Sequence, residues 1–326
     1  MTSIASTKVP NIEAVEDGLV RAGYIPSRQI ATALFLSLRL QKPILVEGPA
    51  GVGKTELAKA AAEFLGLPLI RMQCYEGLDE SKALYEWKYG KQLLYTQILK
   101  DKLGDSFKDT DSLADALKRL SSFSDVFYSH DFLEPRPLLR ALLMQQGAVL
   151  LVDEIDKADE EFEALLLEIL SDYQVSIPEI GTVSAIVPPV VLLTSNNTRD
   201  LGDAMKRRCL HLHIGYPDQK LEERIIDSRV PEVSLHLRKQ LVSFVQQLRS
   251  IDLRKLPSVS ETIDWARALL LLHAKDLNVQ TVQDTLNVLL KFEGDMNTGT
   301  RRAAELTHKA LKEGVGPEGG EAVAAD

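Results

Sequence analysis

The chain has 326 residues, of which 45% are hydrophobic and 26% charged, a composition typical of a folded globular protein with two domains. Its 38 Lys and Arg against 47 Asp and Glu give a net charge of −9, which disfavours binding to nucleic acid through phosphate neutralisation. The only cysteines, Cys74 and Cys209, form no CxxC pair, which excludes a disulfide framework or a metal knuckle. The N-terminus lacks a signal pattern and no apolar run approaches the ~18 residues of a membrane span, so we expect a cytoplasmic protein without a membrane span.

Short apolar runs alternate with helical patterns along the first two-thirds of the chain. The alternation predicts an α/β fold in which a parallel sheet is covered by helices on both faces. After residue 217 the pattern is helical without a convincing strand, which predicts a separate helical domain. We therefore expect an α/β core over residues 1–216, a small helical lid domain over 217–312 and a disordered tail over 313–326. The predicted strands lie at 43–46, 68–72, 148–152, 190–193 and 209–214, and predicted helices include 27–40, 53–65, 235–248 and 260–272.

A glycine-rich segment connects the first predicted strand to the helix that follows it. It matches the pattern GxxxxGK[ST], in which backbone N–H groups and a helix N-terminus cradle phosphate oxygens. Lys54 can reach the β- and γ-phosphates, and the Thr55 hydroxyl can bind Mg²⁺. The predicted ATP-binding residues are Gly48, Pro49, Ala50, Gly51, Val52, Gly53, Lys54, Thr55 and Glu56.

Two adjacent carboxylates, Asp153 and Glu154, follow the predicted strand at 148–152. In a phosphate-binding sheet of this kind, a carboxylate at the end of a strand can bind Mg²⁺ directly or through water, and Asp153 fits that role. Glu154 can orient and polarise a water molecule for in-line attack on the γ-phosphate. Because transfer of phosphate to another substrate needs no such glutamate, the pair favours hydrolysis.

Three further groups of polar residues follow or precede predicted strands. Asn196, with Asn197 as the alternative, can hold the attacking water or touch the γ-phosphate at the carboxyl end of its strand. Lys206, Arg207 and Arg208 either complement a helix dipole or supply an arginine finger to a neighbouring subunit. His211 and His213 lie two residues apart with no third ligand, and we interpret them as structural.

These elements in this order resemble the MoxR family of AAA+ ATPases over roughly residues 25–310. The resemblance implies ATP and Mg²⁺ as cofactors, and a hexameric ring with ATP between neighbouring subunits. It also implies a helical insertion at 78–135 and a hairpin at 174–187, both facing the central pore. MoxR-type ATPases are similar to chaperones that remodel or activate other proteins, often metalloenzymes, with a partner that carries a von Willebrand factor A domain. The matching segments read VEGPAGVGKTELAKA, RMQCYEGLDESKALYEW, LLVDEIDKADEEFEALLLEILSDYQVSIPEIGTV, LLTSNN and RRCLHLHIGYPD.

Carried across by position, the resemblance gives the Walker A roles to Lys54 and Thr55 and the Walker B roles to Asp153 and Glu154. It makes Asn196 the sensor 1 residue. Arg208, with Arg207 as the alternative, becomes the arginine finger. The chain departs from the pattern near the start of a lid helix, where relatives carry a phosphate-sensing arginine and this chain reads Ser-Val-Ser-Glu-Thr at 258–262. Arg267 is the candidate substitute.

The sequence also indicates a class of client protein and disfavours two other functional classes. The segments CYEGLDESKALYEW and EIDKADEEFEA most resemble ATPases linked to maturation of carbon monoxide dehydrogenase-type molybdenum enzymes. A DNA-directed AAA+ motor is disfavoured by the net charge of −9. A nucleotide switch that does not hydrolyse ATP is disfavoured by the presence of Glu154. The sequence therefore favours an ATP-hydrolysing machine that acts on a protein.

Overall fold

The computed structural model describes residues 9–106, 128–178 and 180–314. The chain divides into two compact units. The first comprises the described parts of Met1–Asn11, Thr32–Leu45 and Ala61–His211, and the second comprises Ile12–Ala31, Val46–Ala60 and the described part of Leu212–Asp326. Of the tail expected at 313–326, the first two residues end the last helix, and the rest lies outside the described residues.

A five-stranded parallel sheet lies at the centre of the α/β part of the chain, and the predicted α/β class is confirmed. Its strand order is β2-β5-β8-β1-β9. Strand β5, between β2 and β8, is buried at every residue, which explains why the sequence there is an apolar run up to Asp153. Parallel pairing places Gln73 at the end of β2 opposite Asp153 at the end of β5. The strands are β1 Ile44–Glu47, β2 Leu69–Gln73, β5 Val149–Asp153, β8 Val190–Ser195 and β9 Leu210–His213.

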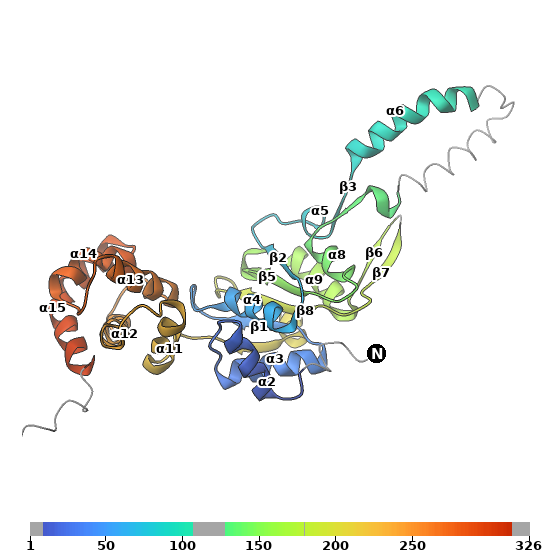
Figure 1. Cartoon of the computed structure of the whole chain (residues 1–326). Helices are drawn as coiled ribbons and strands as arrows, with labels where there is room; N and C mark the ends of the chain where they lie inside the picture. Colours follow the sequence, from blue (N-terminus) through green and yellow to red (C-terminus); the bar gives the residue numbers. More distant parts are fainter. Residues whose placement is uncertain (1–8, 107–127, 179, 315–326) are drawn as a thin grey trace, which may run out of the picture. The chain divides into compact units, whose positions relative to one another are not determined.

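Helices flank this sheet (Figure 1). In the first unit α8 packs against β2 and β5, and α9 contacts α10. Helix α9 begins after Asp159, whose side chain accepts a hydrogen bond from the backbone N–H of Phe162 at 2.9 Å and so caps the helix. The N-terminal helices and those flanking the sheet are α2 Ile12–Arg21, α3 Arg28–Leu40, α4 Lys54–Leu65, α8 Pro137–Leu142, α9 Glu160–Asp172 and α10 Asp203–Arg208.

Two small antiparallel sheets complete the first unit. Strands β6 (Gln174–Ile177) and β7 (Gly181–Ser184) pair within the hairpin segment expected at 174–187, whose residue 179 lies outside the described residues. Strands β3 (Tyr85–Trp87) and β4 (Leu133–Pro135) pair in a region where the sequence pattern predicts mostly helix. Three-residue strands whose partner is more than 40 residues away leave almost no local periodicity to detect.

The rest of the expected insertion at 78–135 contains short helical elements around the β3–β4 pair. These are α5 (Glu80–Ala83), the one-turn helix η1 (His130–Phe132) and the longer helix α6 (Tyr89–Ser106). Helix α6 contacts η1, and the Tyr95 and Phe132 rings lie 5.3 Å apart in edge-to-face geometry. Residues 107–127 of the expected insertion lie outside the described residues.

Among the described residues, five helices follow the sheet and build a core of their own (Figure 1). Trp265 and Phe244 lie fully buried at its centre, with ring centroids 5.3 Å apart. Helix α13 begins with a capping box, in which Ser258 and Glu261 satisfy each other's backbone N–H groups. No strand occurs in the described residues after β9. The helices are α11 Gln219–Arg229, α12 Leu235–Arg249, α13 Val259–Leu271, α14 Val279–Leu289 and α15 Glu293–Gly314.

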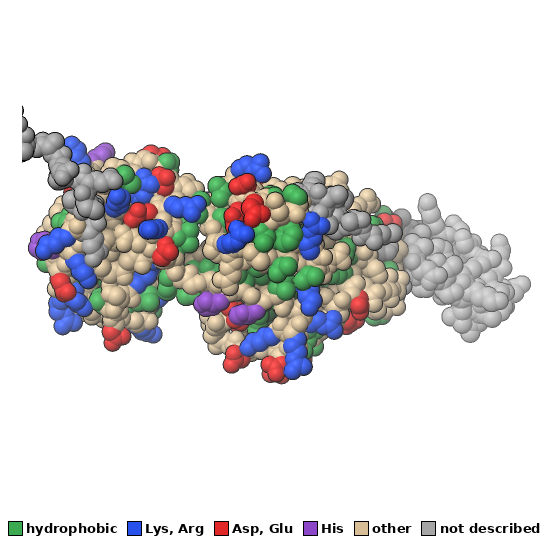
Figure 2. Space-filling model, turned by 90° about the horizontal axis from the view of Figure 1, so that it is seen from below, with side chains coloured by type: hydrophobic (Ala, Val, Ile, Leu, Met, Phe, Trp, Pro, Cys, Tyr) green, Lys and Arg blue, Asp and Glu red, His purple; other side chains and the backbone are tan. Residues whose placement is uncertain are grey.

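The surface carries charges of both signs in close mixture. On the face shown in Figure 2, Lys and Arg side chains alternate with Asp and Glu, and the described residues of that face form no continuous basic band. Nucleic-acid binders usually concentrate basic residues on one face or along one helix. As to membranes, each helix in the described part of the chain is too short or too polar to cross a bilayer.

Candidate functional site

The phosphate-binding loop predicted at 48–55 follows β1 and runs into α4, and its glycines are sterically required. Gly48 has φ +148°, and a Cβ atom there would lie 2.0 Å from the carbonyl oxygen of Ile214. Gly51 has φ +75°, and its Cβ would lie 2.4 Å from the hydroxyl oxygen of Ser258. Any side chain at either position would therefore collide with the chain packed against the loop.

Lys54 stands at the first residue of α4 with its ammonium group turned into the loop. Its side chain is buried, at 7% exposed, and Nζ donates to the carbonyl oxygens of Gly48 at 2.6 Å and Pro49 at 2.8 Å. A buried cation beside a helix N-terminus is an arrangement that attracts phosphate oxygens. The geometry of the loop is thus compatible with the role expected of Lys54.

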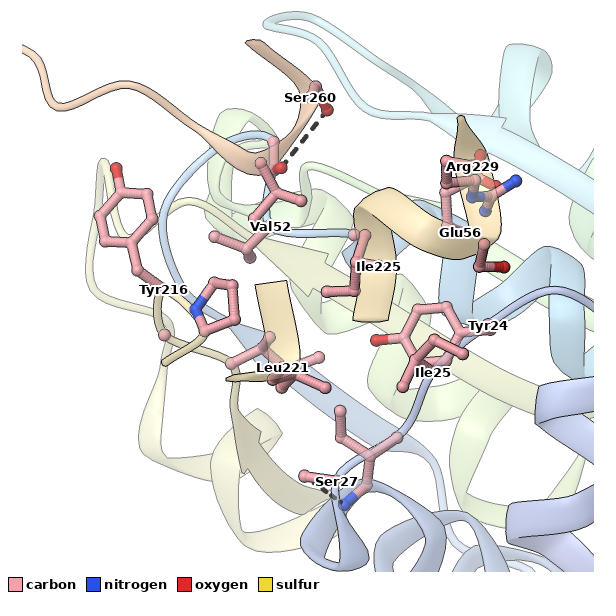
Figure 3. A pocket seen from close by; sticks show the side chains of 18 of the residues that line it. Tyr24, Ile25, Ser27, Val52, Glu56, Tyr216, Leu221, Ile225, Arg229 and Ser260 are labelled. Atoms are coloured by element: carbon pink, nitrogen blue, oxygen red, sulfur yellow. Dashed lines mark hydrogen bonds and ion pairs between the residues drawn. The ribbon is translucent and has the colours of Figure 1, made fainter. Parts of the chain in front are cut away.

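A cavity of about 280 Å³ opens beside the loop within the second unit. Figure 3 shows apolar side chains around it, among them Tyr24, Ile25 and Leu221. The loop itself contributes Gly51, Val52 and Gly53, and the lid contributes residues of α11 and α13. The cavity is close in size to the smaller ligand pockets of proteins and is mainly apolar, as a site for a flat aromatic base would be. Sequence analysis did not assign Tyr24, Ile25, Tyr216, Leu221 and Ile225, which line it.

Glu56, predicted to bind the nucleotide, lines the cavity but is engaged in two ion pairs. Its carboxylate accepts from Arg229 of α11 at 3.0 Å and from Lys59 at 2.6 Å. Burial raises the pKa of Glu56, but the two cations outweigh it and hold that pKa below its usual value. Burial and the Glu56 charge both raise the pKa of the nearby Tyr24 hydroxyl. Glu56, Arg229 and Tyr24 lie together at one side of the cavity in Figure 3.

In the first unit, Asp153 ends β5 almost completely buried, at 3% exposed. Its Oδ2 accepts from Arg71 Nη2 at 2.6 Å and Nε at 3.1 Å, and its Oδ1 accepts from the Thr194 hydroxyl at 2.6 Å. The guanidinium of Arg71 compensates for burial of this negative charge. Carboxylate and hydroxyl oxygens are ligands that Mg²⁺ prefers, so the chemistry of Asp153 and Thr55 fits the expected cation.

Glu154 is held in place by four side chains, which come from β2, from β8 and the turn after it, and from the residues that follow Glu154. It adopts the left-handed conformation (φ 57°, ψ 51°), and its N–H donates to the Thr194 hydroxyl at 2.9 Å. Its carboxylate accepts from Gln73 at 2.9 Å and from Asn196 Nδ2 at 3.3 Å, and it also pairs with Lys157. This constellation presents a fixed carboxylate at the end of the strand, as a group that orients water requires.

The two asparagines after β8 have different surroundings. The Asn196 side chain reaches Glu154, whereas the Asn197 side chain accepts from Ser195 at 3.4 Å within its own turn. Asp156, which sequence analysis did not single out, fixes this turn because its Oδ2 accepts from the N–H groups of Asn196 at 3.2 Å and Thr198 at 3.0 Å. Burial raises the pKa of Asp156, but these hydrogen bonds and that of the Thr198 hydroxyl bring the pKa below its usual value.

The predicted arginines and histidines lie at the surface. Arg207 and Arg208, at the end of α10, are exposed, and their side chains form no hydrogen bond or ion pair with the part of the chain that the structure describes. Arg267 pairs with Asp264 on its own helix at 3.3 Å and does not line the cavity. His213 lines the cavity. Within the described ranges, no three His, Cys, Asp or Glu side chains are grouped as a metal site.

Comparison with known proteins finds similar sequences and structures. An uncharacterised protein of Staphylococcus aureus is 27% identical over 247 residues, which cover 74% of this chain and 79% of that protein. A point mutant of Thermotoga maritima RuvB has a TM-score of 0.47 and 15% identity over 89% of this chain and 73% of its own. The structure of the same RuvB as a Holliday junction branch migration motor has a TM-score of 0.44 and 15% identity, over 91% and 74%.

The profile of one protein family matches residues 43–209, just over half of the chain. The match begins at the start of β1 and ends after α10, so it includes the phosphate-binding loop, both carboxylates that follow β5 and the asparagines that follow β8. These are the elements whose geometry is described above. The chain belongs to the family of AAA domains of the dynein-related subfamily.

Proposed function

We propose that this protein binds ATP with Mg²⁺ and hydrolyses it. The observation that carries the proposal is that Gly51, Val52 and Gly53 of the phosphate-binding loop also form a wall of the mainly apolar cavity. A nucleotide whose phosphates lie in the loop would thereby have its base beside apolar side chains. Lys54 would neutralise the β- and γ-phosphates, and the helix N-terminus would add its partial charge.

Hydrolysis is assigned to the carboxylates of the first unit. Glu154 would orient the attacking water, with Asn196 beside it to hold the same water or the γ-phosphate. Thr55 and Asp153 would hold Mg²⁺, which neutralises the charge that develops on the phosphates. Exposed Arg208, or else Arg207, would act on ATP bound to a neighbouring subunit of a ring, in accord with its lack of partners among the described residues.

The work done with this ATP is proposed to be the remodelling or activation of a client protein by a MoxR-type chaperone. Helix α6 supports the proposal, because it exposes Tyr89 at 65%, Leu93 at 62% and Leu94 at 53%. Apolar side chains grouped on one exposed helix are typical of a protein-binding surface. Following the resemblance, we propose a hexamer, a partner with a von Willebrand factor A domain and a metalloenzyme as client.

Subunit mixing tests the proposed site, because it asks whether two subunits share it. An Arg208→Ala ring and a Glu154→Gln ring should each be nearly inactive, since an arginine finger is worth roughly 10³–10⁵ in turnover. Mixed rings contain some interfaces with both groups intact, so exchange of subunits should restore measurable ATP hydrolysis.

Mixing would be done without unfolding and verified by native mass spectrometry. Activity that never exceeds the weighted mean of the two variants, despite verified mixing, would refute the shared site for Arg208. The same exchange with Arg207→Ala decides between the two arginines. Absence of ATP hydrolysis by the wild-type ring would refute the proposed activity itself.

A further inference from the structure

The lid contains a buried ion pair that lies outside the residues matched by the family profile. Glu222 of α11 is 0% exposed and Arg249 of α12 has a side chain 6% exposed. Two parallel hydrogen bonds join them, from Nη1 to Oε2 and from Nη2 to Oε1, each 2.7 Å long. Fork-to-fork pairing of this kind fixes both side chains in orientation as well as in position.

The remaining hydrogen-bonding groups of this pair are also satisfied. Glu222 accepts from Gln246 of α12 at 2.7 Å and from the Thr262 hydroxyl of α13 at 2.9 Å. Arg249 Nε donates to the carbonyl oxygen of Pro257 at 2.8 Å. A buried ion pair is tolerated when its other lone pairs and protons are bonded. The pair therefore joins α11, α12 and the start of α13 in one fixed arrangement.

This arrangement reaches the cavity wall through two contacts. The Arg249 guanidinium lies over the ring of Tyr216, 4.8 Å from its centroid. Gln246, which also donates to Glu222, donates to the carbonyl oxygen of Pro217 at 3.0 Å. Tyr216 and Pro217 line the cavity, and Tyr216 lies on the side opposite Tyr24 in Figure 3. The ion pair and Gln246 thus fix the positions of Tyr216 and Pro217, which line the cavity and lie between β9 and α11.

A second path leads from the same carboxylate to the phosphate-binding loop. Thr262 donates to Glu222 and lies close to the carbonyl oxygen of its N-cap residue Ser258, 3.1 Å away. In the same turn, both the N–H and the hydroxyl of Ser260 lie 3.3 Å from the carbonyl oxygen of Gly51. Because Thr262 anchors this turn, Glu222 helps to fix the contact between the lid and the loop.

We propose that Glu222 and Arg249 are positioning residues that set the shape of the nucleotide cavity, and thereby the affinity for adenine nucleotides. The inference rests on the proposed function, since it assumes that the cavity holds the nucleotide. Neither residue lines the cavity. They act through Tyr216, Pro217 and the turn that contains Ser260. This turn lies at 258–262, where the chain lacks the phosphate-sensing arginine that the family resemblance predicts.

The test combines binding and turnover in the full-length protein. Glu222→Gln keeps the shape of the side chain and removes its charge, and Tyr216→Leu removes the ring that Arg249 contacts. Each should weaken binding of fluorescent ADP and ATP roughly tenfold, the scale of coupling between contacting residues. Hydrolysis by Glu222→Gln at saturating ATP should change by less than about twofold, because Glu222 does not line the cavity and would affect binding and not the transition state.

Double substitution separates positioning from general destabilisation. If Glu222 acts through Tyr216, the double variant should bind nucleotide little worse than either single variant, whereas independent effects would multiply. The matched control is Glu305→Gln, which removes an exposed carboxylate paired with Arg302 on α15 and should leave affinity unchanged.

Three results would overturn the inference: unchanged affinity in folded Glu222→Gln, effects that multiply, or a loss confined to turnover at saturation. If Glu222→Gln does not fold, Arg249→Lys serves in its place, since a lysine keeps the charge without the two-pronged pairing. A wild-type protein that binds neither ADP nor ATP would refute the proposed function instead. A wild-type protein that hydrolyses ATP, with variants that bind it normally, would refute this inference alone.

Discussion

The charged side chains of Lys54 in the phosphate-binding loop and of Asp153 at the end of β5 are held in place in different ways. Lys54 is bonded to backbone carbonyl oxygens of its own loop, within six residues along the chain. Asp153 is bonded to the side chains of Arg71 and Thr194, which come from two other strands and are 82 and 41 residues away. One charge is therefore positioned by local backbone geometry and the other by long-range side-chain contacts.

The difference has a consequence for mutational sensitivity. In the loop, the backbone conformation depends on Gly48 and Gly51, so a side chain placed at either position should disturb it more than a change to a surrounding side chain. Around Asp153 and Glu154, each partner side chain that is removed leaves a buried or fixed carboxylate with fewer hydrogen bonds. The conformation of the loop should therefore be sensitive to substitution at a few residues, whereas the positions of the two carboxylates should be sensitive to substitution at many.

Of the changes that compare these two regions, removal of the loop cation is expected to have the largest effect on ATP binding. Lys54→Ala should weaken ATP binding roughly 10- to 100-fold, which corresponds to the loss of a charge-assisted hydrogen bond. Lys59→Ala is the matched control, because Lys59 lies on the same helix and only pairs with Glu56 at the surface. Titration with a fluorescent ATP analogue measures both. Normal affinity in a folded Lys54→Ala protein would exclude Lys54 from phosphate binding.

Removal of the Asp153 partner should mainly reduce stability. Arg71→Met leaves the carboxylate buried without its cation, and because half of Arg71 is exposed we expect a loss of about 1–2 kcal/mol in the free energy of unfolding. The urea midpoint measures this loss. Arg302→Met, which breaks an exposed pair, should change the midpoint little. Equal midpoints for Arg71→Met and the wild type would show that Asp153 does not depend on side-chain partners.

The smallest expected effect concerns Asp156 and depends on pH. Asp156→Asn should cost about 1 kcal/mol of stability at neutral pH, since weaker acceptors replace the charged ones for Asn196 and Thr198. Because the pKa of Asp156 in the folded protein is below its ordinary value of 3.8, the stabilisation is present above that value and disappears as the pH falls through the folded-state pKa. Urea unfolding of both proteins between pH 7 and pH 3 measures the gap. A gap that widens on acidification would contradict this account.

The sequence was sufficient for features encoded in contiguous residues. In the main sheet β1, β5 and β8 are mostly apolar runs, and β2 and β9 alternate apolar with polar residues. The loop from Gly48 to Thr55 has a fixed spacing with a strand before it and a helix after it. The carboxylates and Asn196 follow strands, so their placement at strand ends follows from the strand prediction. For these features, local pattern and tertiary structure agree.

Features created by distant contacts could not be derived in this way. Arg71 and Asp156 are ordinary charged residues in the sequence, and only the pairing of β2, β5 and β8 reveals their roles. The cavity combines the phosphate-binding loop with mainly apolar residues from three other stretches, none of which carries a motif. The strands β3 and β4 were missed because each has only three residues.

The central claim, that this chain hydrolyses ATP with Glu154 as the residue that orients water, is tested most directly by Glu154→Gln. Glutamine keeps the size of the side chain but cannot take a proton from water. We expect ATP binding within about twofold of the wild type and single-turnover hydrolysis slower by roughly 10²–10⁴-fold. Glu161→Gln, an exposed carboxylate on α9, should behave like the wild type. Hydrolysis by Glu154→Gln at the wild-type rate, with ATP bound normally, would contradict the account.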